Sequence, residues 1–286
     1  MSRGAVDRTD HVIHDLIKPI PEGTLPERVD AIVHCAANVD ERAVGFSIVD
    51  SNLRITFHVA EFARKAQTSA FVNLSSVAVY GAPSSLNNVT EASPARPVTP
   101  YGLAKMLGES LLTSLPISAV SHLRLGYVIG PNMPDRYFPV RVAERFKANK
   151  AVTVMNPYVT RFSFIETSDV ARACEAALTM GVSGPVNLVA DHRPTPREVI
   201  DTIAAKFPGS TSVITEESAQ VSASLLISIP PGPKIYWASR QSETHSRPSV
   251  NGTCDSAVGA FRSGWFGRLT NRETVARAVR HPFRRC

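Results

Sequence analysis

Short apolar runs alternate with segments of helical periodicity over most of the first 190 residues of this 286-residue chain. The apolar runs predict buried strands at residues 30–37, 70–76 and 120–129. Amphipathic spacing predicts helices between them at residues 49–65 and 101–115. Because strands alternate with helices, the pattern predicts an α/β fold with a doubly wound, Rossmann-like parallel sheet.

A second set of elements follows Pro131. The pattern predicts helices at residues 137–149 and 169–180, and extended segments at residues 151–155 and 186–189. Thr195 is expected to be an N-cap, with Pro196 at the first helical position and Glu198 completing a capping box. We therefore predict a partial nucleotide-binding domain at residues 1–135 and a smaller α/β substrate lobe at residues 136–217.

Residues 218–286 lose this periodicity and predict a poorly ordered tail. The tail has a net charge of +7, whereas the rest of the chain has a net charge of −1. Trp237 and Trp265 are candidates for stacking on nucleic-acid bases, but the basic residues form no helical stripe. A solvated tail is therefore favoured over a nucleic-acid or membrane contact.

The composition is that of an ordinary globular enzyme, with 43% hydrophobic and 20% charged residues. No apolar run has the length of a membrane span, and charged residues interrupt the first 20 positions where a signal peptide would be apolar. The four cysteines and eight histidines show no metal-binding spacing, so we expect no metal, a reduced cytoplasmic setting and no disulfide framework.

The strongest chemical signal is a tyrosine four residues before a lysine, Tyr101 and Lys105, on the helix predicted at residues 101–115. Side chains at this spacing share one face of a helix. A phenol with its ordinary pKa of about 10 is a poor base at neutral pH, but an adjacent ammonium stabilises the phenolate. The pair is therefore suited to moving a proton to or from a substrate hydroxyl.

Several ordered motifs surround this pair, and together they resemble the extended short-chain dehydrogenase/reductase family, in particular its NAD-dependent epimerase/dehydratase branch. The motifs are HDL at residues 14–16, HCAA at 34–37, SNLRIT at 51–56, LSSVAVYG at 74–81, TPYGLAK at 99–105, LRLGYVIGP at 123–131 and TRFSFIETSDVA at 160–171. The resemblance covers about residues 12–215.

The resemblance implies a role for individual residues. The implied catalytic residues are Ser76, Tyr101 and Lys105, and the implied cofactor contacts are Asp15, Leu16, Ala36, Ala37, Asn52, Tyr101 and Lys105. The implied substrate contacts are Ser76, Tyr127 and Arg161. In such an enzyme NAD or NADP exchanges a hydride with a sugar carbon of a nucleotide sugar while the tyrosine exchanges the hydroxyl proton. The sequence leaves open whether the protein forms a homodimer.

The chain departs from the family at its glycines. Only Gly4 and Gly23 precede Gly45, so the Gly-x-x-Gly-x-x-Gly turn that receives the pyrophosphate is missing. We expect the chain to start just before the third strand of the fold, with an apolar sheet edge exposed and NAD(P) binding weakened. Two alternatives stay open: a truncated, non-catalytic relative, or a reductase of carbonyls or carrier-bound thioesters, which the CAANVD run at residues 35–40 also suits.

Overall fold

The computed structural model describes residues 12–39, 45–81, 89–155, 157–158, 161–190 and 192–217. The chain divides into two compact units. The first unit comprises Met1–Ser84, Val89–Leu125 and Cys174–Leu188, and the second comprises Ser85–Asn88, Gly126–Ala173 and Val189–Cys286. The predicted tail at residues 218–286 lies outside the described residues.

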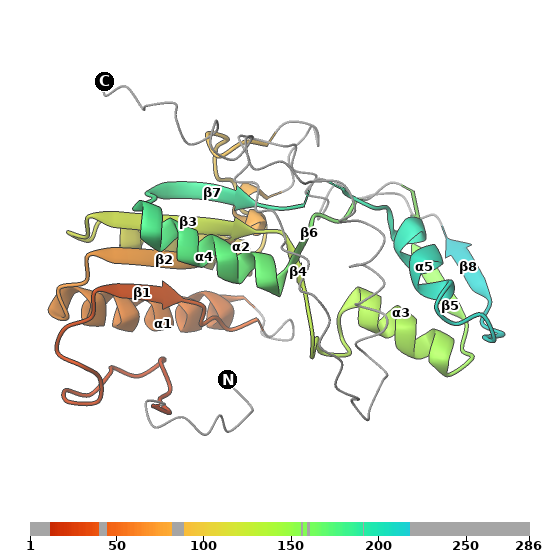
Figure 1. Ribbon diagram of the computed structural model, residues 1–286, viewed down its shortest axis with the longest axis horizontal. Coiled ribbons are helices and arrows are strands. Elements are labelled where there is room, and N and C mark those ends of the chain that lie inside the picture. Colours follow the sequence, from red (N-terminus) through yellow and green to blue (C-terminus); the bar gives the residue numbers. More distant parts are fainter. Residues whose placement is uncertain are drawn as a thin grey trace. The chain divides into compact units, whose positions relative to one another are not determined.

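A four-stranded parallel sheet forms the first unit (Figure 1). Its order is β1 (Ala31–His34), β2 (Ala70–Ser76), β3 (Ala119–Leu125) and β7 (Gly184–Leu188). The predicted α/β fold with a doubly wound parallel sheet is confirmed, and β2 has the predicted bounds. Among the described residues β1 pairs with β2 alone, and Val33 on β1 is 40% exposed.

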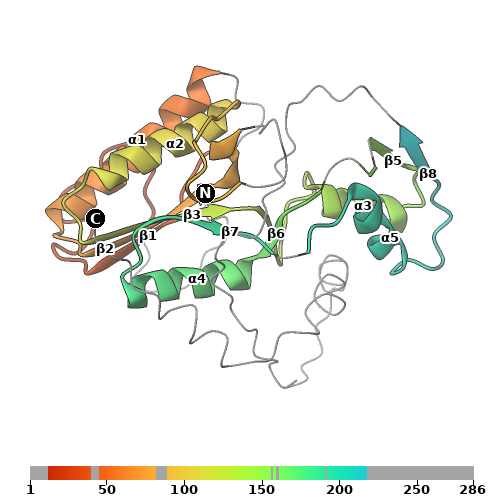
Figure 2. The ribbon, with the colours of Figure 1, turned by 90° about the horizontal axis from the view of Figure 1, so that it is seen from above.

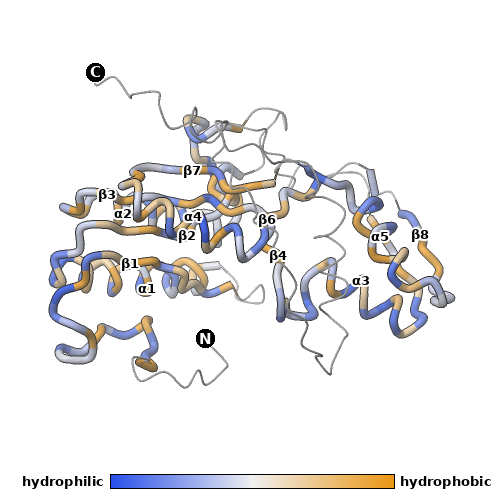
Figure 3. Tube along the Cα trace, in the orientation of Figure 1, coloured by the Kyte–Doolittle hydropathy of each residue, from blue (hydrophilic) through white to orange (hydrophobic). Residues whose placement is uncertain are grey.

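Helices cover both faces of this sheet (Figure 2). Helices α1 (Phe46–Lys65) and α2 (Pro100–Thr113) lie on one face, and the C-terminal half of α4 (Thr167–Met180) lies on the other. Hydrophobic segments follow the strands between them (Figure 3). The core under α1 and α2 consists of Val59, Ala60, Ala63, Phe71, Leu112 and Val120. Within the described part of the chain, no helix is long and apolar enough to cross a bilayer.

In the described part of the second unit there are two small parallel strand pairs and two further helices. Strand β4 (Tyr127–Ile129) pairs with β6 (Phe164–Glu166), and β5 (Val152–Met155) pairs with β8 (Ile214–Glu217). Helices α3 (Phe138–Lys147) and α5 (Pro196–Ala204) pack on a core that includes Phe146, Val152 and Ile200. The predicted capping box is confirmed, since the Thr195 hydroxyl accepts from the Glu198 N–H and the Glu198 carboxylate accepts from the Thr195 N–H.

The structure divides the chain differently from the predicted boundary at residue 135. The predicted strand at residues 120–129 is two strands, because at Gly126 the chain leaves the first sheet and approaches the Ser163 carbonyl so closely that a Cβ would collide with it. The predicted strand at residues 186–189 corresponds to β7, which pairs with β3 and thus belongs to the first unit rather than to a substrate lobe.

Candidate active site

The predicted catalytic residues lie where the carboxyl ends of β1 and β2 meet the first turns of α2. Parallel strands present their carboxyl ends at one edge of the sheet, which is where α/β folds bind ligands. Ser76 ends β2, and its Oγ accepts a hydrogen bond of 3.2 Å from the Ala78 N–H in the 3₁₀ turn η1 (Val77–Tyr80). At Gly102 on α2, a Cβ would collide with the Ala78 carbonyl oxygen. Glycine therefore lets the start of α2, with Tyr101, pack directly against the turn that follows Ser76.

Lys105 is buried between β2 and Tyr101. Lys105 is only 8% exposed, and its Nζ donates a hydrogen bond of 2.7 Å to the Leu74 carbonyl oxygen. The same Nζ lies 5.7 Å from the centroid of the Tyr101 ring. Burial lowers the pKa of Lys105 to about 8, although Cys35 and Glu109 oppose that shift. The structure thus brings Lys105 to Tyr101 and to the end of the strand that carries Ser76.

The end of β1 faces the same ammonium. Burial, followed by the charge of Lys105, lowers the pKa of His34 to about 4, so this imidazole is neutral at neutral pH. His34 is buried, with its Nε2 3.4 Å from the Thr56 hydroxyl. The adjacent residue, Cys35, is exposed. Partial burial of its thiol raises the pKa of Cys35, and Lys105 opposes that shift.

Asn52 holds the loop that contains Ala36 and Ala37. Its Oδ1 accepts from the Asn38 N–H at 2.9 Å, and its Nδ2 donates to the Asn38 carbonyl at 3.0 Å and to the Ile48 carbonyl at 2.8 Å. Since all three bonds go to backbone groups, Asn52 fixes the path of the chain after β1. Ala36 and Ala37 are partly buried in that loop. Their predicted contact with a cofactor stays a prediction.

Leu16 lies against α1, and the neighbouring Asp15 is exposed. The Asp15 carboxylate accepts from the Ile17 N–H at 3.2 Å, and His58 on α1 donates to the Leu16 carbonyl at 2.9 Å. A neighbouring surface cavity of about 470 Å³ lies between residues 19–27 and α1, and none of the predicted site residues lines it. The predicted adenine-side role of Asp15 and Leu16 stays a prediction.

The two predicted substrate contacts Tyr127 and Arg161 belong to the second unit. The Tyr127 hydroxyl accepts from the Phe138 N–H at the start of α3, and its ring meets Phe162 and Phe164 edge to face. Arg161 donates to the Arg193 carbonyl at 2.9 Å. Tyr127 therefore has a local structural role in addition to the predicted one, and both substrate contacts stay predictions.

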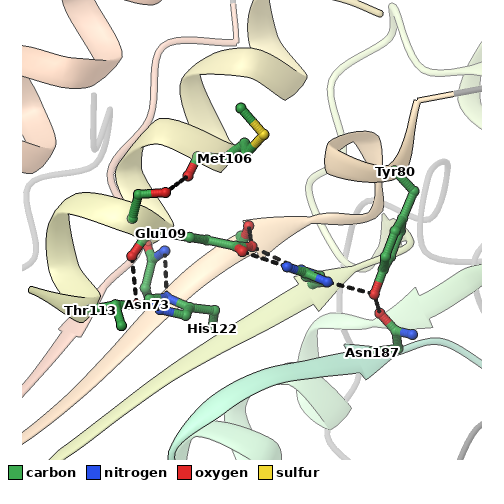
Figure 4. Close-up of polar contacts among 10 residues, drawn as sticks. Asn73, Tyr80, Met106, Glu109, Thr113, His122 and Asn187 are labelled. Atoms are coloured by element: carbon green, nitrogen blue, oxygen red, sulfur yellow. Dashed lines mark hydrogen bonds and ion pairs between the residues drawn. The ribbon is translucent and has the colours of Figure 1, made fainter. Parts of the chain in front are cut away.

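The sequence analysis did not identify a buried polar network that begins one helical turn after Lys105. The network is centred on Glu109 of α2 and Arg124 of β3 (Figure 4). Arg124 binds both carboxylate oxygens of Glu109 and also donates to the Tyr80 hydroxyl. A signal was available, because Glu109 is four residues after Lys105 and so shares its buried helix face.

The buried ammonium of Lys105 predicts a stability effect. Because the pKa of Lys105 is about 8 in the fold and higher in the unfolded chain, charging it costs free energy below pH 8. We expect Lys105→Met to raise the free energy of unfolding at pH 7 by about 2–3 kcal/mol. Between pH 8 and 10 the unaltered protein gains stability, since its unfolded state binds more protons than its folded state. The difference in free energy of unfolding between Lys105→Met and the unaltered protein should therefore narrow over this range. Urea unfolding of both proteins at pH 7 and at pH 10 tests this prediction. A Lys105→Met variant that is less stable than the unaltered protein at pH 7 would contradict it.

Comparisons with known proteins bear on the family of the chain and on its fold. Residues 22–190, more than half of the chain, match the model of the NAD dependent epimerase/dehydratase family. A comparison with curated proteins finds no match.

The solved structures that the chain resembles share its fold. The Bordetella bronchiseptica enzyme WbmG in complex with NAD is 24% identical with a TM-score of 0.61, over 71% of this chain and 63% of that one. UDP-N-acetylglucosamine 4-epimerase from Bacillus cereus is 23% identical with a TM-score of 0.58, over 68% of each chain. RMD from Pseudomonas aeruginosa, complexed with NADPH, is 22% identical with a TM-score of 0.64, over 74% of this chain and 76% of that one. The chain thus spans less than two thirds of WbmG. On the match to the family model, the chain belongs to the NAD dependent epimerase/dehydratase family.

Proposed function

We propose that this protein is an NAD(P)-dependent enzyme of the epimerase/dehydratase type that acts on a nucleotide sugar. The observation that carries the proposal is the buried Lys105 ammonium beside the Tyr101 ring, with Ser76 on the adjoining segment. The fold is shared with WbmG, which was solved with NAD and UDP, and with a UDP-N-acetylglucosamine 4-epimerase. These ligands and this activity belong to those proteins and support the proposal for this one.

The donors at the site fit the nicotinamide ribose of NAD or NADP. An ammonium has three N–H donors, and the bond that Lys105 makes within the described residues is to the Leu74 carbonyl. Its other donors suit the two hydroxyls of a ribose, and Tyr101 lies beside them. Lys105 and Tyr101 would hold this half of the cofactor, with Ala36 and Ala37 in the loop that Asn52 fixes. The chemistry that the bound nicotinamide supplies is hydride exchange with a substrate carbon.

The protein's own part in the reaction is to move one proton and to hold one oxygen. The phenolate oxygen of Tyr101 takes the proton of the substrate hydroxyl and becomes a phenol, and the charge of Lys105 favours the phenolate that this requires. Because the Ser76 oxygen accepts from Ala78, its own O–H is available to donate to the reacting oxygen. Together these groups stabilise negative charge on that oxygen as it loses its proton.

The test is to incubate the protein with NAD or NADP at millimolar concentration and with UDP-glucose or UDP-N-acetylglucosamine as probes. We expect the sugar to be converted to its epimer or to a carbonyl product, which nuclear magnetic resonance of the sugar identifies. Oxidation of NADPH by an acyl thioester instead would favour the reductase alternative. No conversion of either kind at saturating cofactor would favour the non-catalytic alternative and overturn the proposal.

A further inference from the structure

The buried polar network around Glu109 connects α2 with β2, β3, η1 and β7. Glu109 on α2 accepts from Ser75 on β2 and from Arg124 on β3. The bond to Arg124 is bidentate, with Nε to Oε1 at 3.0 Å and a terminal nitrogen to Oε2 at 2.7 Å. Arg124 also donates to the Tyr80 hydroxyl of η1 at 2.7 Å, and that hydroxyl donates to Asn187 of β7 at 2.6 Å (Figure 4).

Burial makes this pair costly unless its geometry is kept. The side chains of Glu109 and Arg124 are each 8% exposed. Removing two charges from water costs several kcal/mol per ion, and apolar replacements of similar volume are often as stable. Stability alone therefore gives no reason for a charged pair here. The pair instead fixes the position of α2 on the sheet. A bidentate guanidinium–carboxylate contact is planar, so it allows little sliding or rotation of the helix.

The pair is also placed to act on Lys105. Glu109 is one helical turn beyond Lys105 on the same face of α2, and its negative charge raises the pKa of Lys105 against the effect of burial. The other groups that face Lys105 are His34 and Cys35 at the end of β1 and Tyr101 on α2 itself. His34 is neutral at neutral pH because its pKa is about 4. Glu109 is thus the carboxylate that favours the ammonium form of Lys105.

We propose that Glu109 and Arg124 are positioning residues, which fix α2 on β2 and β3 and keep Lys105 charged beside Tyr101. The proposal rests on the proposed function for its effect on turnover. Its effect on Lys105 is independent of any substrate or cofactor.

The experiment compares Glu109→Gln with the double variant Glu109→Leu/Arg124→Met. Glu109→Gln keeps the shape and an acceptor but removes the charge, and it leaves Arg124 buried without a carboxylate. In the double variant both charges are replaced by apolar groups, so we expect it to unfold at a urea concentration close to that of the unaltered protein. Lysine side-chain nuclear magnetic resonance then measures the titration of Lys105, whose pKa of about 8 we expect to fall in both variants.

Turnover with the UDP-sugar probe supplies the second readout. We expect kcat to fall by about tenfold to a hundredfold in both variants, with KM little changed, since the groups that hold the substrate stay in place. Glu61→Gln is the matched control, because it breaks an exposed pair with Arg64 on α1, and it should change neither readout.

Two outcomes would overturn the proposal. One is a Lys105 titration that is unaltered in the variants; the other is a double variant that regains turnover together with stability, which would leave the pair a merely structural role. Should the unaltered protein show no turnover at all, the proposed function fails, and the titration of Lys105 still decides the positioning role.

Discussion

Replacement of Tyr101 by phenylalanine is expected to lower kcat by about 10²–10⁴-fold, the range for loss of a general acid–base group. Only the hydroxyl is removed, so the ring that lies 5.7 Å from the Lys105 ammonium stays in place. Binding of substrate and cofactor should change much less than turnover, since the proton is transferred in the chemical step. The measurement is kcat and KM for the UDP-sugar probe at saturating cofactor.

Tyr158→Phe provides the matched control for that variant. Tyr158 is 62% exposed in the second unit, and its hydroxyl donates to Glu216 at 2.9 Å. Loss of that hydroxyl should leave kcat unaltered. Retention of most of the activity by Tyr101→Phe would show that another group moves the proton, and the proposed role of Tyr101 would be wrong.

Local signals allowed much of the fold to be predicted. The apolar run at residues 70–76 coincides with β2. Such a short run is typical of a strand that is buried on both faces, so it could be assigned from the sequence. Thr99 and Pro100 start α2, with the Thr99 hydroxyl accepting from the Gly102 N–H at 3.1 Å. The capping box at Thr195 follows the same local logic. Caps and periodicity depend on neighbours a few residues away, so they can be read from the sequence.

Contacts between distant residues could not be predicted in this way. The split at Gly126 depends on the Ser163 carbonyl, which is remote in the sequence. The hydrogen bonds of Asn52 to backbone groups of Asn38 and Ile48 depend on how the chain after β1 packs on α1. The pairing of Glu109 with Arg124 requires α2 and β3 to be adjacent, which only the folded chain provides. In each case tertiary packing decides which residues meet, and such contacts produce no periodic pattern in the sequence.

The second large effect concerns the cofactor itself, for which this 286-residue chain should have low affinity. In the family the pyrophosphate is held by N–H groups of a glycine-rich turn and a helix N-terminus, and this sequence has no Gly-x-x-Gly-x-x-Gly cluster. Gly23 does not replace it, because no helix follows Gly23 before β1 begins at Ala31. Each missing charge-assisted bond is worth about 1.5–3 kcal/mol, so the loss of two or three weakens binding by about two to six orders of magnitude.

Titration calorimetry with two probes separates the halves of the ligand. Lys105 and Tyr101 offer donors for the nicotinamide ribose alone, so nicotinamide mononucleotide should bind within about tenfold of NAD, which is less than the energy of one charge-assisted bond. Lys105→Met should weaken binding of both probes by about tenfold to a hundredfold, because it removes the ammonium that we propose holds the ribose. Micromolar binding of NAD, with much weaker binding of the mononucleotide, would contradict this prediction, since the pyrophosphate and adenosine would then be held by other residues of the chain.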